Sequence, residues 1–140
     1  MTTDLCDTCA CVGCSEGNCC GTCGSTPIGF REYQNGAAAT ARGHLPLDGE
    51  KGRLSVAAMG LCGESGELVD HIKKHVGHGH ELDREAVAKE LGDVLWYIAE
   101  IATTLGMDLQ QIAERNEEKL RSRYPEGFSV ERSRNRGANR

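Results

Sequence analysis

Apolar residues recur at the 3.6-residue spacing of an α-helix along most of residues 30–124. An alanine-rich run favours a first helix over about residues 30–42. Glycines and Pro46 then predict a loop over residues 43–53. The start of the periodic part of the chain is therefore a short helix that is followed by a turn.

Two longer helices form the centre of the pattern. One is predicted over about residues 54–76 with Gly77 as its C-cap. After a turn at residues 77–82, the other begins at Asp83, a favoured N-cap residue, and closes before Gly106. Their apolar stripes comprise Leu54, Ala58, Leu61, Ser65, Leu68, Ile72 and Val76, and then Val87, Leu91, Val94, Leu95, Ile98, Ala102 and Leu105.

A fourth helix begins at Asp108, with Gln111 in the position of a capping box, and is stopped by Pro125. Its apolar stripe contains Leu109, Ile112, Ala113 and Leu120. Residues 129–140 carry four arginines against one glutamate and show no periodicity, so we expect a disordered basic tail.

Two acidic pairs lie beside the central apolar stripes. Glu64 and Glu67 share one helix face, and Glu90 and Asp93 share another, because residues three apart are neighbours on a helix. If the two helices run antiparallel, four carboxylates meet, and such a cluster requires cations. A solvated helix face is the alternative reading.

The donor set narrows the choice of cation. All-oxygen sites suit Mg²⁺, Mn²⁺ or Ca²⁺. The calcium-loop pattern of an EF-hand is absent, and the Glu-x-x-His motif of di-iron bundles fails, because Asp70 and Asp93 stand where histidines are needed. Magnesium, which bridges carboxylates to substrate phosphates, is the remaining candidate.

Other polar and small residues allow two readings each. Asn116, Lys119 and Arg123 run along one edge of the fourth helix, either facing an anionic ligand or with the asparagine bonded to a neighbouring helix. Three interior glycines, Gly60, Gly63 and Gly66, indicate close helix packing or room for a ligand. Exposure is more typical than metal binding for the clustered histidines His75, His78 and His80. Cys62 is more typical of a core position than of a nucleophile.

Cysteines crowd the first 27 residues. Seven of the eight in the chain form or adjoin C-x-x-C pairs: Cys6, Cys9, Cys11, Cys14, Cys19, Cys20 and Cys23. Almost nothing apolar accompanies them, so thiolate binding of a metal, most simply Zn²⁺, is the first reading. A disulfide-linked peptide and a reduced, disordered tail are the alternatives.

Composition sets the remaining limits. A chain of 140 residues fits one domain of ordinary size, and its net charge of −5 argues against nucleic-acid binding. No run approaches the ~20 apolar residues of a membrane span, and no signal-peptide pattern is present, so we expect a cytoplasmic protein. Helices so poor in aromatic residues often complete their core across a subunit interface, which favours an oligomer.

Four stretches together resemble the MazG-like all-α nucleoside triphosphate pyrophosphohydrolases. They are F-R-E-Y-Q at residues 30–34, G-L-C-G-E-S-G-E-L-V-D-H-I-K-K at 60–74, K-E-L-G-D-V-L-W-Y-I-A at 89–99 and N-E-E-K-L-R-S-R-Y-P-E-G-F at 116–128. The likeness implies an all-α bundle of four to five helices over residues 28–128, completed by assembly into a homodimer or homotetramer. It is closest to the small bacteriophage members, whose compartment would be the host cytoplasm.

The resemblance also implies a reaction. Glu64, Glu67, Glu90 and Asp93 would bind Mg²⁺ (or Mn²⁺), and a (deoxy)nucleoside triphosphate would be hydrolysed between its α and β phosphates to the monophosphate and pyrophosphate. Gly63 replaces the leading glutamate of the family pattern. Substrate contacts would come from Gln34, Lys74, Tyr97, Asn116, Lys119 and Arg123. The competing hypothesis is a non-catalytic helical module that docks a partner through its cysteine-rich segment.

Overall fold

The computed structural model describes residues 28–41 and 49–134, and five helices but no β-strand occur in these ranges. The helices are α1 (Phe30–Ala41), α2 (Gly49–His78), α3 (Arg84–Thr104), α4 (Leu109–Arg123) and α5 (Val130–Arg134). The all-α prediction is therefore confirmed. None of these helices is long and apolar enough to cross a membrane.

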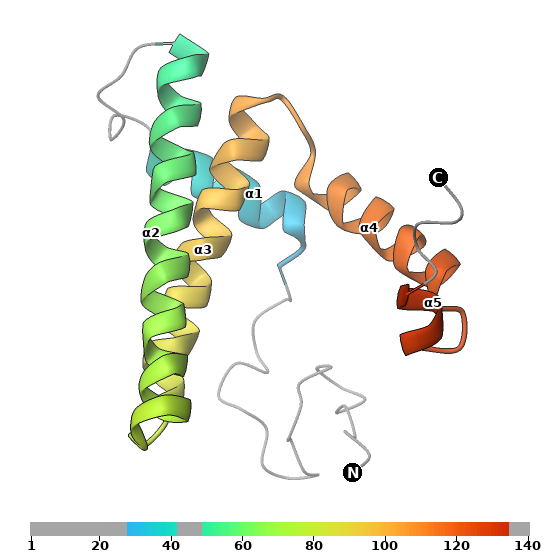
Figure 1. The fold of residues 1–140 in the computed structure, drawn as a ribbon. Coiled ribbons are helices and arrows are strands. Elements are labelled where there is room, and N and C mark those ends of the chain that lie inside the picture. The colour runs from blue at the N-terminus through green and yellow to red at the C-terminus, as the bar shows by residue number, and fades with distance from the viewer. Residues whose placement is uncertain (1–27, 42–48, 135–140) are drawn as a thin grey trace, which may run out of the picture.

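The architecture is organised around the antiparallel pair formed by α2 and α3 (Figure 1). Helix α1 crosses this pair and contacts α3 and α4. Helix α4 leaves the end of α3 at an angle and carries α5 at its far end (Figure 1). The long hairpin and the α4–α5 segment therefore extend as two separate arms.

Local signals set the helix ends around this hairpin. The side chain of Asp83 accepts a hydrogen bond of 3.0 Å from the Ala86 amide, and Asp108 accepts one of 2.9 Å from the Gln110 amide, so both predicted N-caps are confirmed. Gly106 follows α3 with a φ of 65°, a left-handed conformation that glycine adopts at little cost. These capping residues define the connections on either side of α3.

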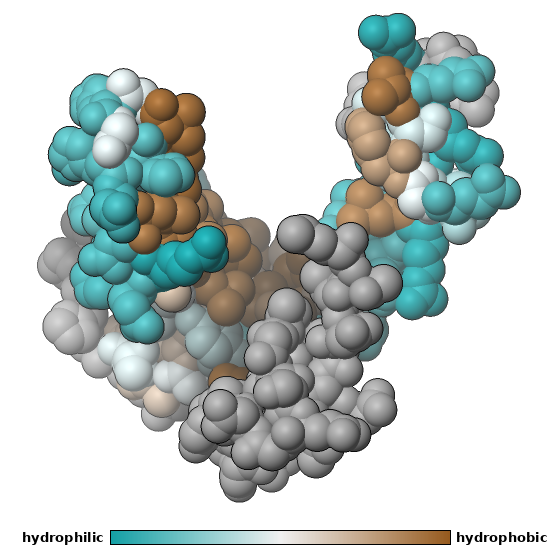
Figure 2. Space-filling model, turned by 90° about the horizontal axis from the view of Figure 1, so that it is seen from below, coloured by the Kyte–Doolittle hydropathy of each residue, from teal (hydrophilic) through white to brown (hydrophobic). Residues whose placement is uncertain are grey.

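The buried core is small and consists largely of alanine. Ala37, Ala99, Ala102 and Leu109 form it, and Tyr33 and Trp96 pack against it. Much apolar surface remains uncovered, including Val69, Ile72, Leu91, Ile112 and Leu120. Figure 2 shows a hollow between the two arms, with hydrophobic residues on the facing surfaces of both.

Three predictions about α2 were wrong. The helix begins at Gly49 rather than near Leu54, because a contact of Arg53 with α3 holds its first turn despite the glycines. It continues to His78, and Gly79, with a φ of 72°, replaces Gly77 as the left-handed residue at its end. Ala57, not Ala58, is the buried alanine.

Several other expectations differ from the structure. Ile72, Val76, Leu91 and Leu105 were predicted to lie in core stripes but are at least 41% exposed, because no element of the described chain covers them. Part of the expected basic tail, Val130–Arg134, is the short helix α5. The remainder of the tail and the cysteine-rich segment of residues 1–27 lie outside the described residues.

Candidate active site

Three carboxylates converge between α2 and α3. Glu64 comes from α2, and Glu90 and Asp93 lie one turn apart on α3. Each of these residues offers a carboxylate oxygen, and the three oxygens lie within 4.8 Å of one another. We refer to Glu64, Glu90 and Asp93 as the acid cluster.

Burial of negative charge makes the acid cluster costly on its own. Glu90 is only 5% exposed, and its Oε2 has no hydrogen-bond partner within the described ranges. The nearest ammonium group, Lys89 Nζ, lies 3.7 Å from the other oxygen, Oε1. A buried carboxylate oxygen without a donor is unfavourable unless something positive reaches it.

The electrostatics of Glu64 lead to the same conclusion. Burial raises the pKa of the Glu64 carboxyl, and the nearby negative charges of Glu67, Asp93 and Glu90 raise this pKa further. The cluster therefore resists holding all its negative charges at once. A divalent cation would remove this repulsion and would supply the partner that Glu90 Oε2 lacks, so the residues present fit a metal ion.

Glu67 does not join the other three acids. It is exposed, and it lies outside the group of oxygens within 4.8 Å, although it is close enough to influence the pKa of Glu64. The sequence predicted four converging carboxylates, and the structure brings three together. Next to them, Gly63 and Gly66 face open space, since a Cβ at either position would meet nothing within 4 Å beyond its chain neighbours and the backbone of its own helix.

Tyr97 lies one turn beyond Asp93 and packs directly on α2. A Cβ added to Gly60 would lie 2.2 Å from two carbon atoms of the Tyr97 ring, so glycine is required there by close packing. The Trp96 and Tyr97 rings make an edge-to-face contact with centroids 4.9 Å apart. Of the two readings offered for the glycines, close packing holds for Gly60 but not for Gly63 or Gly66.

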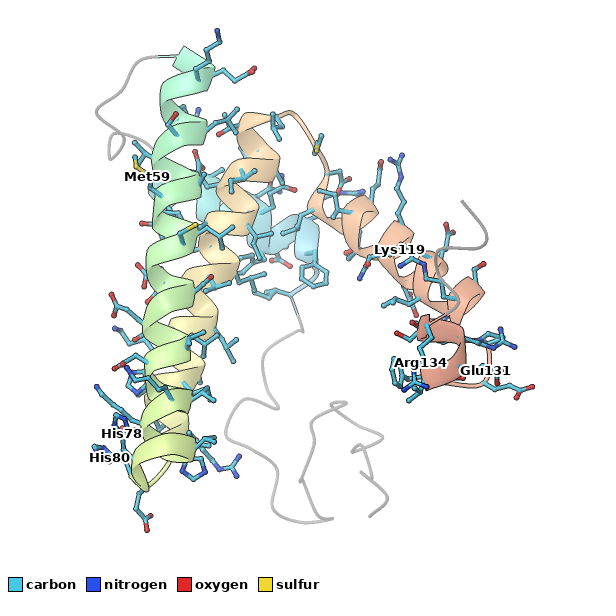
Figure 3. All side chains as sticks on the ribbon, viewed as in Figure 1. Met59, His78, His80, Lys119, Glu131 and Arg134 are labelled. Atoms are coloured by element: carbon cyan, nitrogen blue, oxygen red, sulfur yellow. The ribbon has the colours of Figure 1, made fainter. Side chains whose placement is uncertain are left out.

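The predicted phosphate-binding cations are not at the acid cluster within this one chain. Lys74 Nζ lies 2.6 Å from Asp70 on the exposed side of α2, where Lys73 pairs with the same carboxylate. Asn116, Lys119 and Arg123 are exposed on α4. Figure 3 shows Lys119 on the arm that extends away from α2.

Gln34 uses its amide group for a different purpose from the predicted one. Its Nε2 donates to Met107 O at 2.8 Å and to Thr103 Oγ1 at 3.1 Å, and its Oε1 accepts from the Leu109 amide at 2.9 Å. These bonds attach α1 to the connection between α3 and α4. Gln34 is therefore a structural residue in this conformation.

Sequence reasoning missed Tyr33, the neighbour of Gln34. Its hydroxyl lies 3.5 Å from Gly92 O, and its pKa is raised by burial and by the charge of Asp93. The α1 residue that faces the acids is thus the tyrosine. The available signal was a tyrosine in the first turn of the predicted helix, because its side chain combines an apolar ring with a polar hydroxyl group.

The remaining candidates lie on the surface. His75 Nδ1 is 2.8 Å from His80 O, and His75, His78 and His80 are all exposed, as predicted, although His75 and His78 belong to the last turns of α2. Cys62 is exposed rather than part of the core, so that prediction was wrong.

Comparison with known proteins identifies the family. Residues 54–128 match the family model of the MazG nucleotide pyrophosphohydrolase domain, and these residues include the whole acid cluster. The chain is also 39% identical over 101 residues to the Gene 37 protein of Mycobacterium phage L5, a match that covers 68% of this chain and 88% of that protein. No solved structure matches it. The chain therefore belongs to the MazG nucleotide pyrophosphohydrolase family, as a member of the phage type.

Proposed function

We propose that the protein hydrolyses (deoxy)nucleoside triphosphates at the α–β phosphate bond in a Mg²⁺-dependent reaction that releases the monophosphate and pyrophosphate. The observation that supports this most is the acid cluster, whose three carboxylate oxygens lie within 4.8 Å of one another. The buried Glu90 oxygen without a donor supports the same reading. Membership of the family supplies the nucleotide as the substrate class.

Glu64, Glu90 and Asp93 would hold the metal ion, and exposed Glu67 would hold a second ion. Carboxylate oxygens suit Mg²⁺, with Mn²⁺ as a substitute. When bound, the ion neutralises charge on the phosphates and lowers the pKa of a bound water. The protein would contribute an aromatic wall on one side of the site, built from the Tyr97 ring packed on Gly60 and from the partly buried Tyr33.

A second copy of the chain would complete the site. Helix α4, which lies on the arm that extends away from α2 (Figure 1), exposes Asn116, Lys119 and Arg123, and it also exposes apolar Ile112 and Leu120. The positive charges of Lys119 and Arg123 complement the negative charge of the acid cluster. A homodimer or homotetramer in which α4 of one copy approaches α2 and α3 of another would bring phosphate-binding cations to the metal and would cover exposed apolar surface.

The activity is tested by incubating the purified full chain with a panel of (d)NTPs and Mg²⁺ and identifying the products. Monophosphate and pyrophosphate are expected, and Glu90→Gln should abolish their release. Glu81→Gln, an exposed acid in the turn between α2 and α3, serves as a matched control that keeps full activity. Absence of both products with every nucleotide would refute the proposal.

The shared site is tested by mixing two inactive variants. Glu90→Gln lacks a metal ligand, and Lys119→Ala/Arg123→Ala lacks the cations of α4. If the site is shared between copies, co-refolded mixtures regain part of the activity that neither variant has alone. If each copy works by itself, the mixture stays inactive. Within the host cytoplasm, such an enzyme would adjust nucleotide pools.

The alternative of a non-catalytic module that docks a partner through the cysteine-rich segment is not favoured. The family match covers the acid cluster, whereas that segment lies outside the matched residues. Full turnover after deletion of residues 1–27 would place catalysis in the helices alone. Metal analysis of the same segment would show whether its cysteines hold Zn²⁺.

A further inference from the structure

An ion pair with a buried carboxylate and a partly exposed guanidinium joins α2 to α3 away from the acid cluster. Glu100 is fully buried, and its Oε1 accepts two hydrogen bonds from Arg53, from Nη2 at 2.5 Å and from Nε at 3.2 Å. Thr104 Oγ1 donates to the same oxygen at 3.3 Å. Glu100 Oε2 has no partner in the part of the chain that the structure describes. The proposed reaction uses none of these groups.

Three contacts show that this ion pair and the acid cluster share one helix–helix seam. Arg53 meets Glu100 at one end, Gly60 meets Tyr97 in the middle, and Glu64 meets Glu90 and Asp93 farther along. The residues of α3 that make these contacts are 90, 93, 97 and 100. They are alternately three and four residues apart, which is the spacing of one continuous contact face between two packed helices. The position of the acids along the seam therefore depends on the register of α2 against α3.

No large apolar side chain of α2 or α3 is fully buried to fix that register. Ala57, which lies on α2 between Arg53 and Gly60, is fully buried, and Gly60 offers no side chain. Small residues tolerate sliding, because a displaced alanine loses little contact. A slip of one turn would shift α2 by about 5.4 Å, far more than a metal site with metal–oxygen distances of about 2 Å can absorb.

We propose that Arg53 and Glu100 are positioning residues that set the register of α2 on α3 and thereby place Glu64 opposite Glu90 and Asp93. The buried carboxylate of Glu100 suits this purpose, because a misaligned Arg53 would leave that negative charge buried and alone. Glu64 lies eleven residues from Arg53 along α2, so the ion pair acts from about 16 Å away. The consequence for metal binding rests on the proposed function, but the register itself does not.

The test is a double substitution, Arg53→Met/Glu100→Met, in the full chain. Methionine has about the length of glutamate, replaces the apolar stem of arginine, and removes both charges. Mn²⁺ titration should show an affinity lower by about 10–100-fold, the range seen when groups supporting metal ligands are removed. Nuclear Overhauser contacts between the Gly60 α-protons and the Tyr97 ring, which report the native register without metal, should weaken or move. The melting temperature of the variant is also measured, to show that it is folded during the Mn²⁺ titration and the Overhauser measurement.

The matched control is Glu117→Met/Arg121→Met. These two residues form an exposed ion pair on α4, in which Arg121 Nη2 lies 2.6 Å from Glu117 Oε1. The control should change neither the Mn²⁺ affinity nor the Gly60–Tyr97 contacts. If the Arg53/Glu100 double variant keeps both native values, the inference is overturned and the pair serves stability alone. If the native protein binds no Mn²⁺ but the double variant loses the Gly60–Tyr97 contacts, the register role stands and the metal-dependent function fails.

Should the double variant not fold, Arg53→Lys takes its place, because lysine retains the charge but not the two-nitrogen geometry. This variant should show a smaller loss of the Gly60–Tyr97 contacts, and unchanged contacts would overturn the proposal.

Discussion

Replacing Gly60 by alanine should destabilise the α2–α3 pair even though alanine is the better helix former. A Cβ at residue 60 would lie 2.2 Å from Cε1 and Cζ of Tyr97 and 2.7 Å from its hydroxyl oxygen. Carbon atoms in contact normally stand about 3.5–4.0 Å apart, so the ring or the helix would have to move by more than about 1 Å. The Tyr97 ring is wedged between α2 and Trp96, and the displacement would also disturb that contact.

The magnitude follows from two opposing terms. Alanine in place of glycine in a helix interior contributes about 1 kcal/mol of stability. Overpacking of a closely fitted contact costs about 1–3 kcal/mol. Gly63→Ala on the same helix has only the first term, since that position faces open space. The free energy of unfolding should therefore be about 1–3 kcal/mol lower for Gly60→Ala than for Gly63→Ala.

Urea unfolding followed by circular dichroism measures this difference. Tyr97→Ala supplies the internal control: in that background the clash is gone, and Gly60→Ala should raise the free energy of unfolding. Equal stabilisation by Gly60→Ala and Gly63→Ala in the native background would refute the packing of Tyr97 on Gly60.

Three further predictions concern single groups. Because the pKa of Glu64 is raised, protons compete with metal at its carboxylate, and the Mn²⁺ affinity should fall as the pH drops through that pKa. Over the same pH range the metal-free protein should gain stability relative to Glu64→Gln. Mn²⁺ titration and urea unfolding at a series of pH values measure these two changes, and a constant affinity together with a constant stability difference would contradict the prediction. Asp83→Ala should lower the free energy of unfolding by about 1 kcal/mol, and Asp83→Asn should lower it less, because asparagine keeps an acceptor for the Ala86 amide. Equal urea midpoints for the two variants would show that Asp83 does not act as an N-cap. Gln34→Leu should cost about 1–3 kcal/mol in the same assay and leave the nucleotide preference unchanged, whereas an altered preference at native stability would return Gln34 to the substrate site.

Features that depend on neighbouring residues could be predicted from the sequence. Asp83 and Asp108 cap helices through bonds to amides two or three residues away, and this is a local effect. The proximity of Glu90 to Asp93 follows from helix geometry alone. The existence of the four main helices and the acidic site between two of them therefore followed from the sequence.

Features set by contacts between distant residues could not be predicted. The start of α2 at Gly49 depends on Arg53 and Glu100, which are 47 positions apart. Which acid of α2 faces the cluster, Glu64 or Glu67, depends on the rotation of the helix about its axis, and the apolar period leaves that angle undetermined by tens of degrees. The same rotation buries Ala57 in place of Ala58. The register of α2 against α3 could not be predicted either, because it depends on contacts between distant residues, such as Arg53 with Glu100 and Gly60 with Tyr97.

The central claim is that the acid cluster directs attack on the α-phosphorus of a nucleoside triphosphate. Hydrolysis in ¹⁸O-water, followed by ³¹P NMR of the products, tests it most directly, because the label marks the phosphorus that water attacks. With Mg²⁺ present, the label should appear in the monophosphate while pyrophosphate remains unlabelled, and Glu90→Gln should give neither product. Label in pyrophosphate, or release of orthophosphate, would contradict the account.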